Sequence, residues 1–408
     1  MKNMGRWVNI LILNFCVVAF LGFTLRSKIL FSVPFLDYNR LLDAHFHFAF
    51  GGWVTLALVV LLINELLPPV QKQKKVYQWL PVCFLCASWL LLIASPLPAN
   101  SIGASLCSTV FILVTYVFAY FFIVDIKRSF VSRTIKLLAI SSMICLVLSS
   151  LGVFALVYLF GSKSLNTFAY RDALYTYLHL QYNGFFTLAV FAILFQRIEP
   201  KMTEESKRKV YQFSLWLCIS TFPSLFLTYL WRDPNIAYRV IAIGGSITLL
   251  LCFAFFVRLA LSLKAIYSMV TPLIRNMAFL SMSALALKIF LQIFTLFPVV
   301  GNAVFGDRPV IIGFLHLVFL GFVTLFLMAW FAQNGFLNLK SGFTKFALGI
   351  FTAAVILNEA VLMTQGLGAM FIKSSNIFPW LLWVLSIMLL LGALLIAMAR
   401  LIIIKLSK

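Results

Sequence analysis

Residues 47–56 read HFAFGGWVTL, and a closely matching stretch returns twice farther along the chain. Residues 179–188 read HLQYNGFFTL and residues 316–325 read HLVFLGFVTL, so all three align without a gap as H-x4-G-[WF]-[VF]-T-L. The leading histidines lie 132 and 137 residues apart in a chain that has only four histidines. Recurrence at a fixed period is typical of an architecture built by repetition. The pattern therefore predicts three repeated units.

The composition places these units in a lipid bilayer. Hydrophobic residues make up 63% of the 408 residues and charged residues 11%, and the mean hydropathy is +1.05. A soluble domain of this size needs far more polar surface. Because no linker or low-complexity run interrupts the apolar segments, we expect a single transmembrane domain over residues 1–408.

Twelve apolar segments are long enough to span a membrane, and prolines and short polar turns separate them. They cover residues 6–26, 43–67, 76–97, 101–125, 135–161, 173–196, 210–231, 235–262, 276–299, 309–333, 343–366 and 377–404. The expected fold is thus an all-α polytopic membrane protein with twelve transmembrane helices. They form three four-helix repeats with pseudo-three-fold symmetry, at approximately residues 1–130, 131–265 and 266–408.

Positive charge predicts the orientation of these helices. With the N-terminus in the cytoplasm, the cytoplasmic loops and termini hold 22 of the 32 Lys and Arg residues, and the opposite loops hold 9. This asymmetry follows the positive-inside rule. We therefore expect a multi-pass protein of the cytoplasmic (inner) membrane with both termini cytoplasmic. The net charge of +21 then reflects topology and contact with lipid headgroups, not a nucleic-acid partner.

The repeated stretches open the second, sixth and tenth spans, which all run in the same direction. His47, His179 and His316 therefore share a similar depth in the outer half of the membrane. A single histidine in such a helix is usually a hydrogen-bonded interior residue, whereas three at matching depth favour ligation of a metal or cofactor. The repeat also predicts that these three spans pack together at the centre, surrounded by the other nine.

Twelve helices in three four-helix units, with histidines on spans two, six and ten, resemble the catalytic subunit of haem-copper oxidases and nitric oxide reductases. The motif H-x-H-x4-G, which begins at His45, more closely resembles the NnrS-type membrane proteins, short twelve-helix relatives linked to haem, copper and nitric oxide metabolism. The resemblance implies a low-spin haem between a span-two histidine (His45 or His47) and His316. It also implies that His179 is a ligand of copper or non-haem iron.

The chain departs from the family pattern around the metal. Span ten has one histidine, His316, in place of a pair, and span seven has none. Asn183 stands where the oxidases have a tyrosine and the nitric oxide reductases a glutamate, with Tyr182 one position early, and Phe48 replaces the usual NnrS glutamate. A complete haem-copper centre is therefore not expected, because copper or iron held by His179 alone would be weakly retained.

A haem needs axial imidazoles, an apolar slot and cations for its propionates. The 43 Phe, 13 Tyr and 9 Trp residues offer aromatic walls for a haem, which is most simply b-type. Arg40, Arg171 and Arg308 precede the repeat histidines by seven or eight residues and are candidates for the propionates. The alternative is that these three arginines only anchor the helices at the membrane interface.

The two histidines of span two have to be told apart. Two residues on a helix lie about 200° apart, so His45 and His47 cannot both face one narrow slot. His47 is in register with His179 and His316, whereas Tyr177 and Phe314 stand where His45 would recur. We therefore expect His47 to be the ligand opposite His316. His45 would then hydrogen-bond Asp43 or water, or bind a second metal.

These observations predict a haem protein in respiratory or nitric-oxide-related redox processes. It would be a haem-dependent oxidoreductase taking electrons from a donor protein or quinol. Two alternatives are a proton-coupled transporter or permease and a non-catalytic haem or metal sensor or assembly factor. Lys288 and Glu359, charged residues in the middle of spans nine and eleven, are expected to form an ion pair, with a proton route as the alternative.

Overall fold

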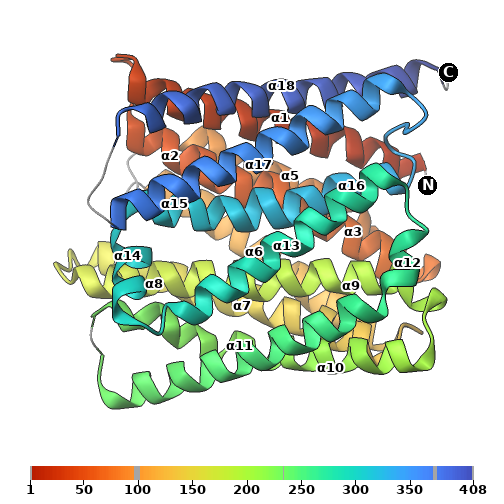
Figure 1. Ribbon diagram of the computed structural model, residues 1–408, viewed down its shortest axis with the longest axis horizontal. Helices are drawn as coiled ribbons and strands as arrows, with labels where there is room; N and C mark the ends of the chain where they lie inside the picture. Colours follow the sequence, from red (N-terminus) through yellow and green to blue (C-terminus); the bar gives the residue numbers. More distant parts are fainter. Residues whose placement is uncertain (1, 96–101, 233, 371–374, 407–408) are drawn as a thin grey trace.

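The computed structural model describes residues 2–95, 102–232, 234–370 and 375–406. In these ranges the chain is helical and contains no strand. Long helices run back and forth along one direction, and both chain ends lie at the same end of the bundle (Figure 1). We call this the terminal end and the opposite one the distal end.

Eleven described helices are long and apolar enough to cross a membrane, and the number is twelve if the bent pair α10–η4 is counted as one span. The first third of the chain forms α1 (Lys2–Leu30), α2 (Tyr38–His47), η1 (Phe48–Thr55), α3 (Leu56–Leu66), α4 (Pro69–Lys72), α5 (Lys75–Ala94) and α6 (Ile102–Lys127). The second forms α7 (Arg133–Gly161), α8 (Thr167–His179), η2 (Leu180–Phe186), α9 (Thr187–Ile198), η3 (Glu199–Lys201), α10 (Glu204–Thr221), η4 (Pro223–Arg232), α11 (Ile236–Ser262) and α12 (Lys264–Ser268). The last forms α13 (Pro272–Phe294), α14 (Pro298–Gly306), α15 (Arg308–His316), η5 (Leu317–Thr324), α16 (Leu325–Gln333), α17 (Gly342–Met370) and α18 (Ile377–Leu406). The expected multi-pass, all-helical architecture is therefore observed.

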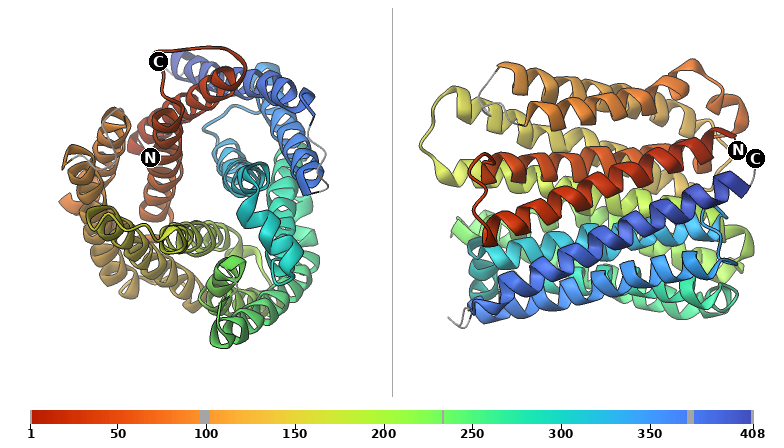
Figure 2. Two further views of the ribbon diagram at one scale, coloured as in Figure 1. Left: turned by 90° about the vertical axis from the view of Figure 1, so that its left-hand side faces the viewer. Right: turned by 90° about the horizontal axis from the view of Figure 1, so that it is seen from above.

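Three of these crossings form the centre of the bundle: span two (α2–η1–α3), span six (α8–η2–α9) and span ten (α15–η5–α16). Their most apolar windows are 83%, 94% and 56% buried, and none of the other eight unbroken spans in the described ranges exceeds 50%. The rings of Phe50, Phe186 and Phe319, one from each span, meet at centroid distances of 4.2 to 5.7 Å. The view from the distal end shows the other helices arranged around these spans (Figure 2). The predicted central packing is confirmed.

The sequence repeat has a local structural counterpart. In each central span the α-helix widens into a π-helix directly after the repeat histidine, which caps the wider segment. These segments are η1, η2 and η5, and each ends at the threonine of the motif or at the residue before it. Short π-helical segments inside α-helices are rare and are often found at functional sites. The sequence pattern did not predict this change of helix type.

The motif glycine lets neighbouring helices approach closely in two of the three spans. A Cβ atom added to Gly184 would lie 2.4 Å from the Cβ of Cys145 on α7, far inside normal contact. A Cβ atom on Gly321 would lie 3.2 Å from the Cβ of Ala284 on α13, a tight but less severe contact. The missing side chain therefore serves helix packing at these positions.

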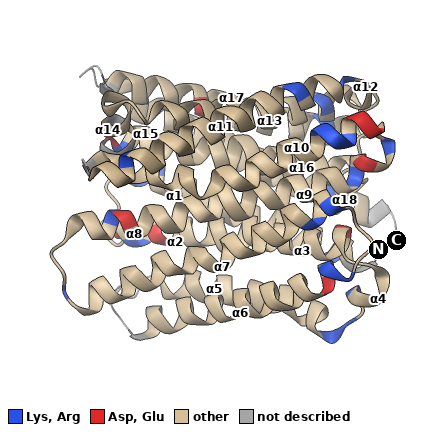
Figure 3. Cartoon of the chain, turned by 90° about the horizontal axis from the view of Figure 1, so that it is seen from below, with Lys and Arg blue, Asp and Glu red and all other residues tan. Residues whose placement is uncertain are grey.

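Charged residues gather at the terminal end. Lys and Arg residues are densest there, around α4, α10 and α12 (Figure 3). Arg400 of α18 donates to Asn9 Oδ1 of α1 at 2.7 Å, so it joins the last helix to the first. Asp125 is buried and accepts from Lys74 and from the Tyr77 hydroxyl, the latter at 2.8 Å. Hydrogen bonds of charged side chains thus link neighbouring helices at the terminal end of the bundle.

Candidate functional site

Two histidines from different central spans lie near each other toward the distal end. His45 of α2 and His316 of α15 are close enough for their charges to interact, and Arg26 of α1 interacts with both. Two consecutive helices, α1 and α2, and the distant α15 therefore contribute to one polar cluster in an apolar bundle. We call these residues, together with Arg308, the histidine–arginine cluster.

The ring of His45 packs against α1. A Cβ added to Gly22 would lie 3.2 Å from His45 Cε1, so the glycine leaves room for the imidazole. The ring also interacts with the backbone carbonyl of Val18, which can only accept a hydrogen bond. Its Nδ1 is buried and has no hydrogen-bond partner among the described residues. The ring hydrogen therefore belongs on Nε2 beside the carbonyl, and Nδ1 keeps an unused lone pair.

His316 shows the same division of roles between its two nitrogens. Its Nδ1 lies 2.8 Å from the carbonyl oxygen of Ile312, one turn earlier in α15. Because a carbonyl oxygen only accepts, Nδ1 carries the hydrogen and Nε2 has the lone pair. An imidazole whose N–H is held by a carbonyl in this way is oriented for ligation through the other nitrogen.

His179, the equivalent residue of span six, has no such free nitrogen. It is fully buried, and its Nε2 donates to the carbonyl oxygen of Thr221 at 2.8 Å. The amide of Asn183 donates to Nδ1 at 3.0 Å. No group of three His, Cys, Asp or Glu side chains suited to a metal occurs in the described part of the chain. The geometry argues against the metal-ligand role that the resemblance implied for His179, because both nitrogens are already engaged.

A proline bend supplies the acceptor for His179. Pro223, which has no N–H, is the first residue of the tighter helix η4, which follows α10. The axes of α10 and η4 differ by 41°. In η4 the Leu225 N–H donates to the Phe222 carbonyl rather than to Thr221, four residues back. The Thr221 carbonyl instead accepts the hydrogen bond from His179. Span seven thus provides a backbone oxygen where the family pattern has a pair of histidines.

Of the three arginines proposed from the sequence, one lies in the cluster. Arg308 stacks over the ring of Tyr38 at 4.9 Å and interacts electrostatically with Arg26. Arg171 lies over the ring of Trp231 at 4.8 Å, beside span six, and Arg40 is exposed at the start of α2. Arg26 was missed because the search was confined to arginines just before the repeat histidines. Its position as the first basic residue at the distal end of α1 is the signal that could have found it.

His47 is not the residue that the structure brings beside His316. Its half-buried ring contacts Phe46 at a centroid distance of 5.3 Å, and no hydrogen bond of this ring is seen in the described residues. The face of α2 that meets α1 carries His45, and His47 points about 200° away. The geometry therefore favours His45, in place of the expected His47, as the partner of His316.

The expected ion pair between Lys288 and Glu359 is not formed. Lys288 points toward span six, with its ammonium 5.6 Å from the centre of the Tyr182 ring. Glu359 on α17 accepts a hydrogen bond from its neighbour Asn358 at 3.1 Å. Salt bridges within the described ranges all involve other residues. The rotation of α13 about its axis directs Lys288 to the bundle centre and away from α17.

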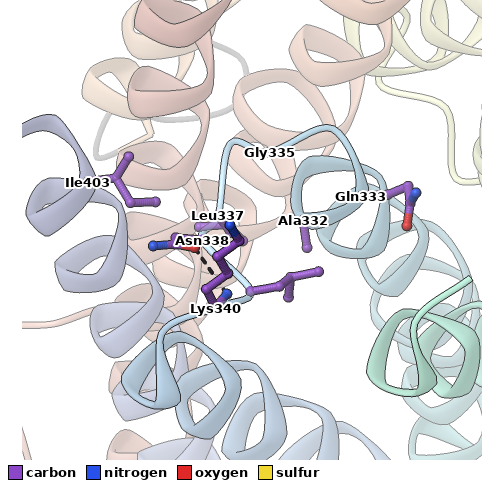
Figure 4. A pocket seen from close by; sticks show the side chains of 8 residues that line it. Ala332, Gln333, Gly335, Leu337, Asn338, Lys340 and Ile403 are labelled. Carbon is purple, nitrogen blue, oxygen red and sulfur yellow. Dashed lines mark hydrogen bonds between the residues drawn. The ribbon is translucent and has the colours of Figure 1, made fainter. Parts of the chain in front are cut away.

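A large surface hollow of about 470 Å³ lies elsewhere, at the terminal end. It is lined by Ala332, Gln333, Gly335, Leu337, Asn338, Leu339, Lys340 and Ile403. Figure 4 shows these side chains around the turn after α16, where Asn338 Oδ1 accepts from the Lys340 backbone N–H at 3.0 Å. The hollow contains no histidine and is at the opposite end of the bundle from the histidine–arginine cluster.

What the histidine–arginine cluster can bind follows from the chemistry of its residues alone. A scan against protein-family models and a search of curated proteins both find no match for this chain.

Proposed function

We propose that this protein binds a b-type haem in the membrane, and that His45 and His316 would hold its iron. The observation that carries the proposal is the matched state of the two imidazoles. His316 directs its Nδ1–H to the Ile312 carbonyl, the His45 ring interacts with the Val18 carbonyl, and each imidazole keeps one nitrogen with an unused lone pair. Ligand histidines of metal sites have this arrangement. When bound, the haem would supply one-electron redox chemistry.

The surrounding residues fit such a group. A buried nitrogen without a partner, such as His45 Nδ1, destabilises the fold by about 1–3 kcal/mol, and a bound metal would remove that penalty. Arg26 and Arg308 offer two cations at one edge of the cluster for the anionic propionates. Tyr38, under the Arg308 guanidinium, holds that side chain in place.

The wider assignment follows from the same residues. We place the chain in the haem-copper oxidase and nitric oxide reductase superfamily, in a short branch like the NnrS-type proteins. The π-helices after His47, His179 and His316 support three four-helix repeats with pseudo-three-fold symmetry. The Lys and Arg at the terminal end support cytoplasmic termini in the inner membrane. With His179 fully hydrogen-bonded, the proposed role is haem redox chemistry in respiration or nitric oxide metabolism, without a complete copper centre.

The test is an optical spectrum of the purified protein, oxidised and reduced. We expect a six-coordinate low-spin haem signal that is lost in His45→Ala and in His316→Ala. His47→Ala is the matched control, because it removes an imidazole two residues away and should leave the signal intact. Loss of the signal in His47→Ala with retention in His45→Ala would reverse the ligand assignment. A wild-type protein without a haem spectrum after haem supplementation would overturn the proposal in favour of a transporter.

A further inference from the structure

A small cavity lies between span six, η4 and the corner formed by α13, α14 and α15. Its volume is about 40 Å³, enough for a few water-sized groups. Tyr182 of η2, Thr228 of η4, and Gln292 and Thr295 at the distal end of α13 supply its polar lining. This cavity is separate from the histidine–arginine cluster, because none of the cluster residues lines it.

Gln292 is the unexplained residue of this cavity. It is only 4% exposed, and neither its amide nitrogen nor its amide oxygen has a hydrogen-bond partner among the described residues. The hydroxyls of Thr228 and Thr295 donate to backbone carbonyls at 2.7 Å, so they form no hydrogen bond with the Gln292 side-chain amide. Buried polar groups are normally hydrogen-bonded. The Gln292 amide is therefore a donor and acceptor that face a space able to hold a ligand.

Lys288 adds charge to the same region. It lies one helical turn before Gln292, is 3% exposed, and has its ammonium against the ring of the cavity-lining Tyr182. Among the described residues Lys288 forms no salt bridge and no hydrogen bond, and it reaches the cavity only through its contact with Tyr182, because it does not line the cavity itself. An ammonium buried in a membrane protein normally has a counter-charge.

We infer that this cavity binds a small inorganic anion, of about the size of a halide. Lys288 supplies the counter-charge, and the amide nitrogen of Gln292 donates a hydrogen bond. The flexible four-carbon stem of Lys288 lets its ammonium approach the cavity past Tyr182. The inference is independent of haem binding, because none of its residues belongs to the histidine–arginine cluster.

Bromide is a suitable probe, since it can be titrated by calorimetry and located by anomalous scattering in crystals. We expect one bromide per chain in the wild type, at least tenfold weaker binding in Lys288→Met, and a smaller loss in Gln292→Leu. Lys340→Met is the matched control: it removes an exposed lysine at the terminal end and should bind as the wild type does.

Equal affinity in Lys288→Met, or a wild-type cavity that holds only water in bromide-soaked crystals, would overturn the inference. If Lys288→Met is not monodisperse, the charge-retaining Lys288→Arg takes its place beside Gln292→Leu. Binding must then persist in the arginine variant and weaken in the leucine variant. Loss of binding in Lys288→Arg, or full binding in Gln292→Leu, would contradict the site.

Discussion

His179 and His316 hold the same position in the sequence repeat, yet the structure gives them different chemistry. His179 is sealed by Thr221 and Asn183, so both of its nitrogens are used. His316 donates one hydrogen bond to its own helix and keeps a lone pair beside His45 and Arg26. A repeated residue type therefore fixes where an imidazole stands in the bundle. Its hydrogen-bond partners, in its own span and in neighbouring helices, determine whether one of its nitrogens keeps a lone pair.

The largest expected effect concerns the packing that encloses His179. Gly184→Val would drive a branched side chain into Cys145 on α7, and we expect a loss of about 3 kcal/mol in stability or outright misfolding. Gly321→Val should be milder, because its neighbour Ala284 is farther away. Thermal unfolding in detergent measures both, with Gly349→Val as a control at a position with open space. Equal losses at Gly184 and Gly321 would contradict the tighter enclosure of span six.

The second prediction tests the structural role of His179 itself. His179→Leu removes the donor to the Thr221 carbonyl and the acceptor of Asn183, and should destabilise the protein by about 2 kcal/mol. Haem content and spectrum should not change. Adding Asn183→Leu should cost less than the sum of the two single changes, since a double mutant leaves fewer orphaned groups. A lost haem or metal signal in His179→Leu would show that this histidine is a ligand after all.

The third prediction compares Arg26 and Arg308 of the cluster with Arg171, which lies on span six outside the cluster. Arg26→Gln and Arg308→Gln should each weaken haem retention about tenfold, which corresponds to about 1.4 kcal/mol, because each removes a cation from the proposed propionate edge. Arg171→Gln, which loses the contact with Trp231 outside the cluster, should retain haem like the wild type. The haem-to-protein ratio after dilution into apomyoglobin measures the difference. Identical haem loss in all three variants would remove the distinction.

The smallest expected effect lies between spans two and ten. Trp53 Nε1 donates to Thr324 Oγ1 at 3.0 Å, a buried link between the two spans that carry the proposed ligands. Trp53→Phe should lower stability by about 1 kcal/mol and shift the haem spectrum slightly, because the spans are less firmly held together. Thr248→Val is a control on α11, where the hydroxyl bonds only its own helix. An unchanged melting temperature in Trp53→Phe would show that ring packing alone holds this contact.

The sequence predicted the crossings well and the rotations of the helices poorly. Apolar length and turns located the helices, and the three-fold motif predicted their central packing, because both depend on positions along the chain. The pairing of His45 with His316 and the direction of Lys288 depend on how each helix is turned about its axis. The rotation of each helix is set by its packing against neighbours that are distant in the sequence, which a repeat within one span does not encode. The His45 ring packs against Gly22 and Val18 on α1. Both residues lie outside the repeated motif, so the motif could not predict this contact.

The bond from Arg400 to Asn9 has a consequence for the order of assembly in the cell. Helix α1 is synthesised long before α18, the helix that packs against it and bonds to it. At 5–20 residues per second, the ribosome needs roughly 20 to 80 s to supply it. During that interval Asn9 and the adjoining face of α1 await their partner, and insertion chaperones have time to engage them. The contact between α1 and α18 therefore forms late, only after most of the bundle has already been synthesised.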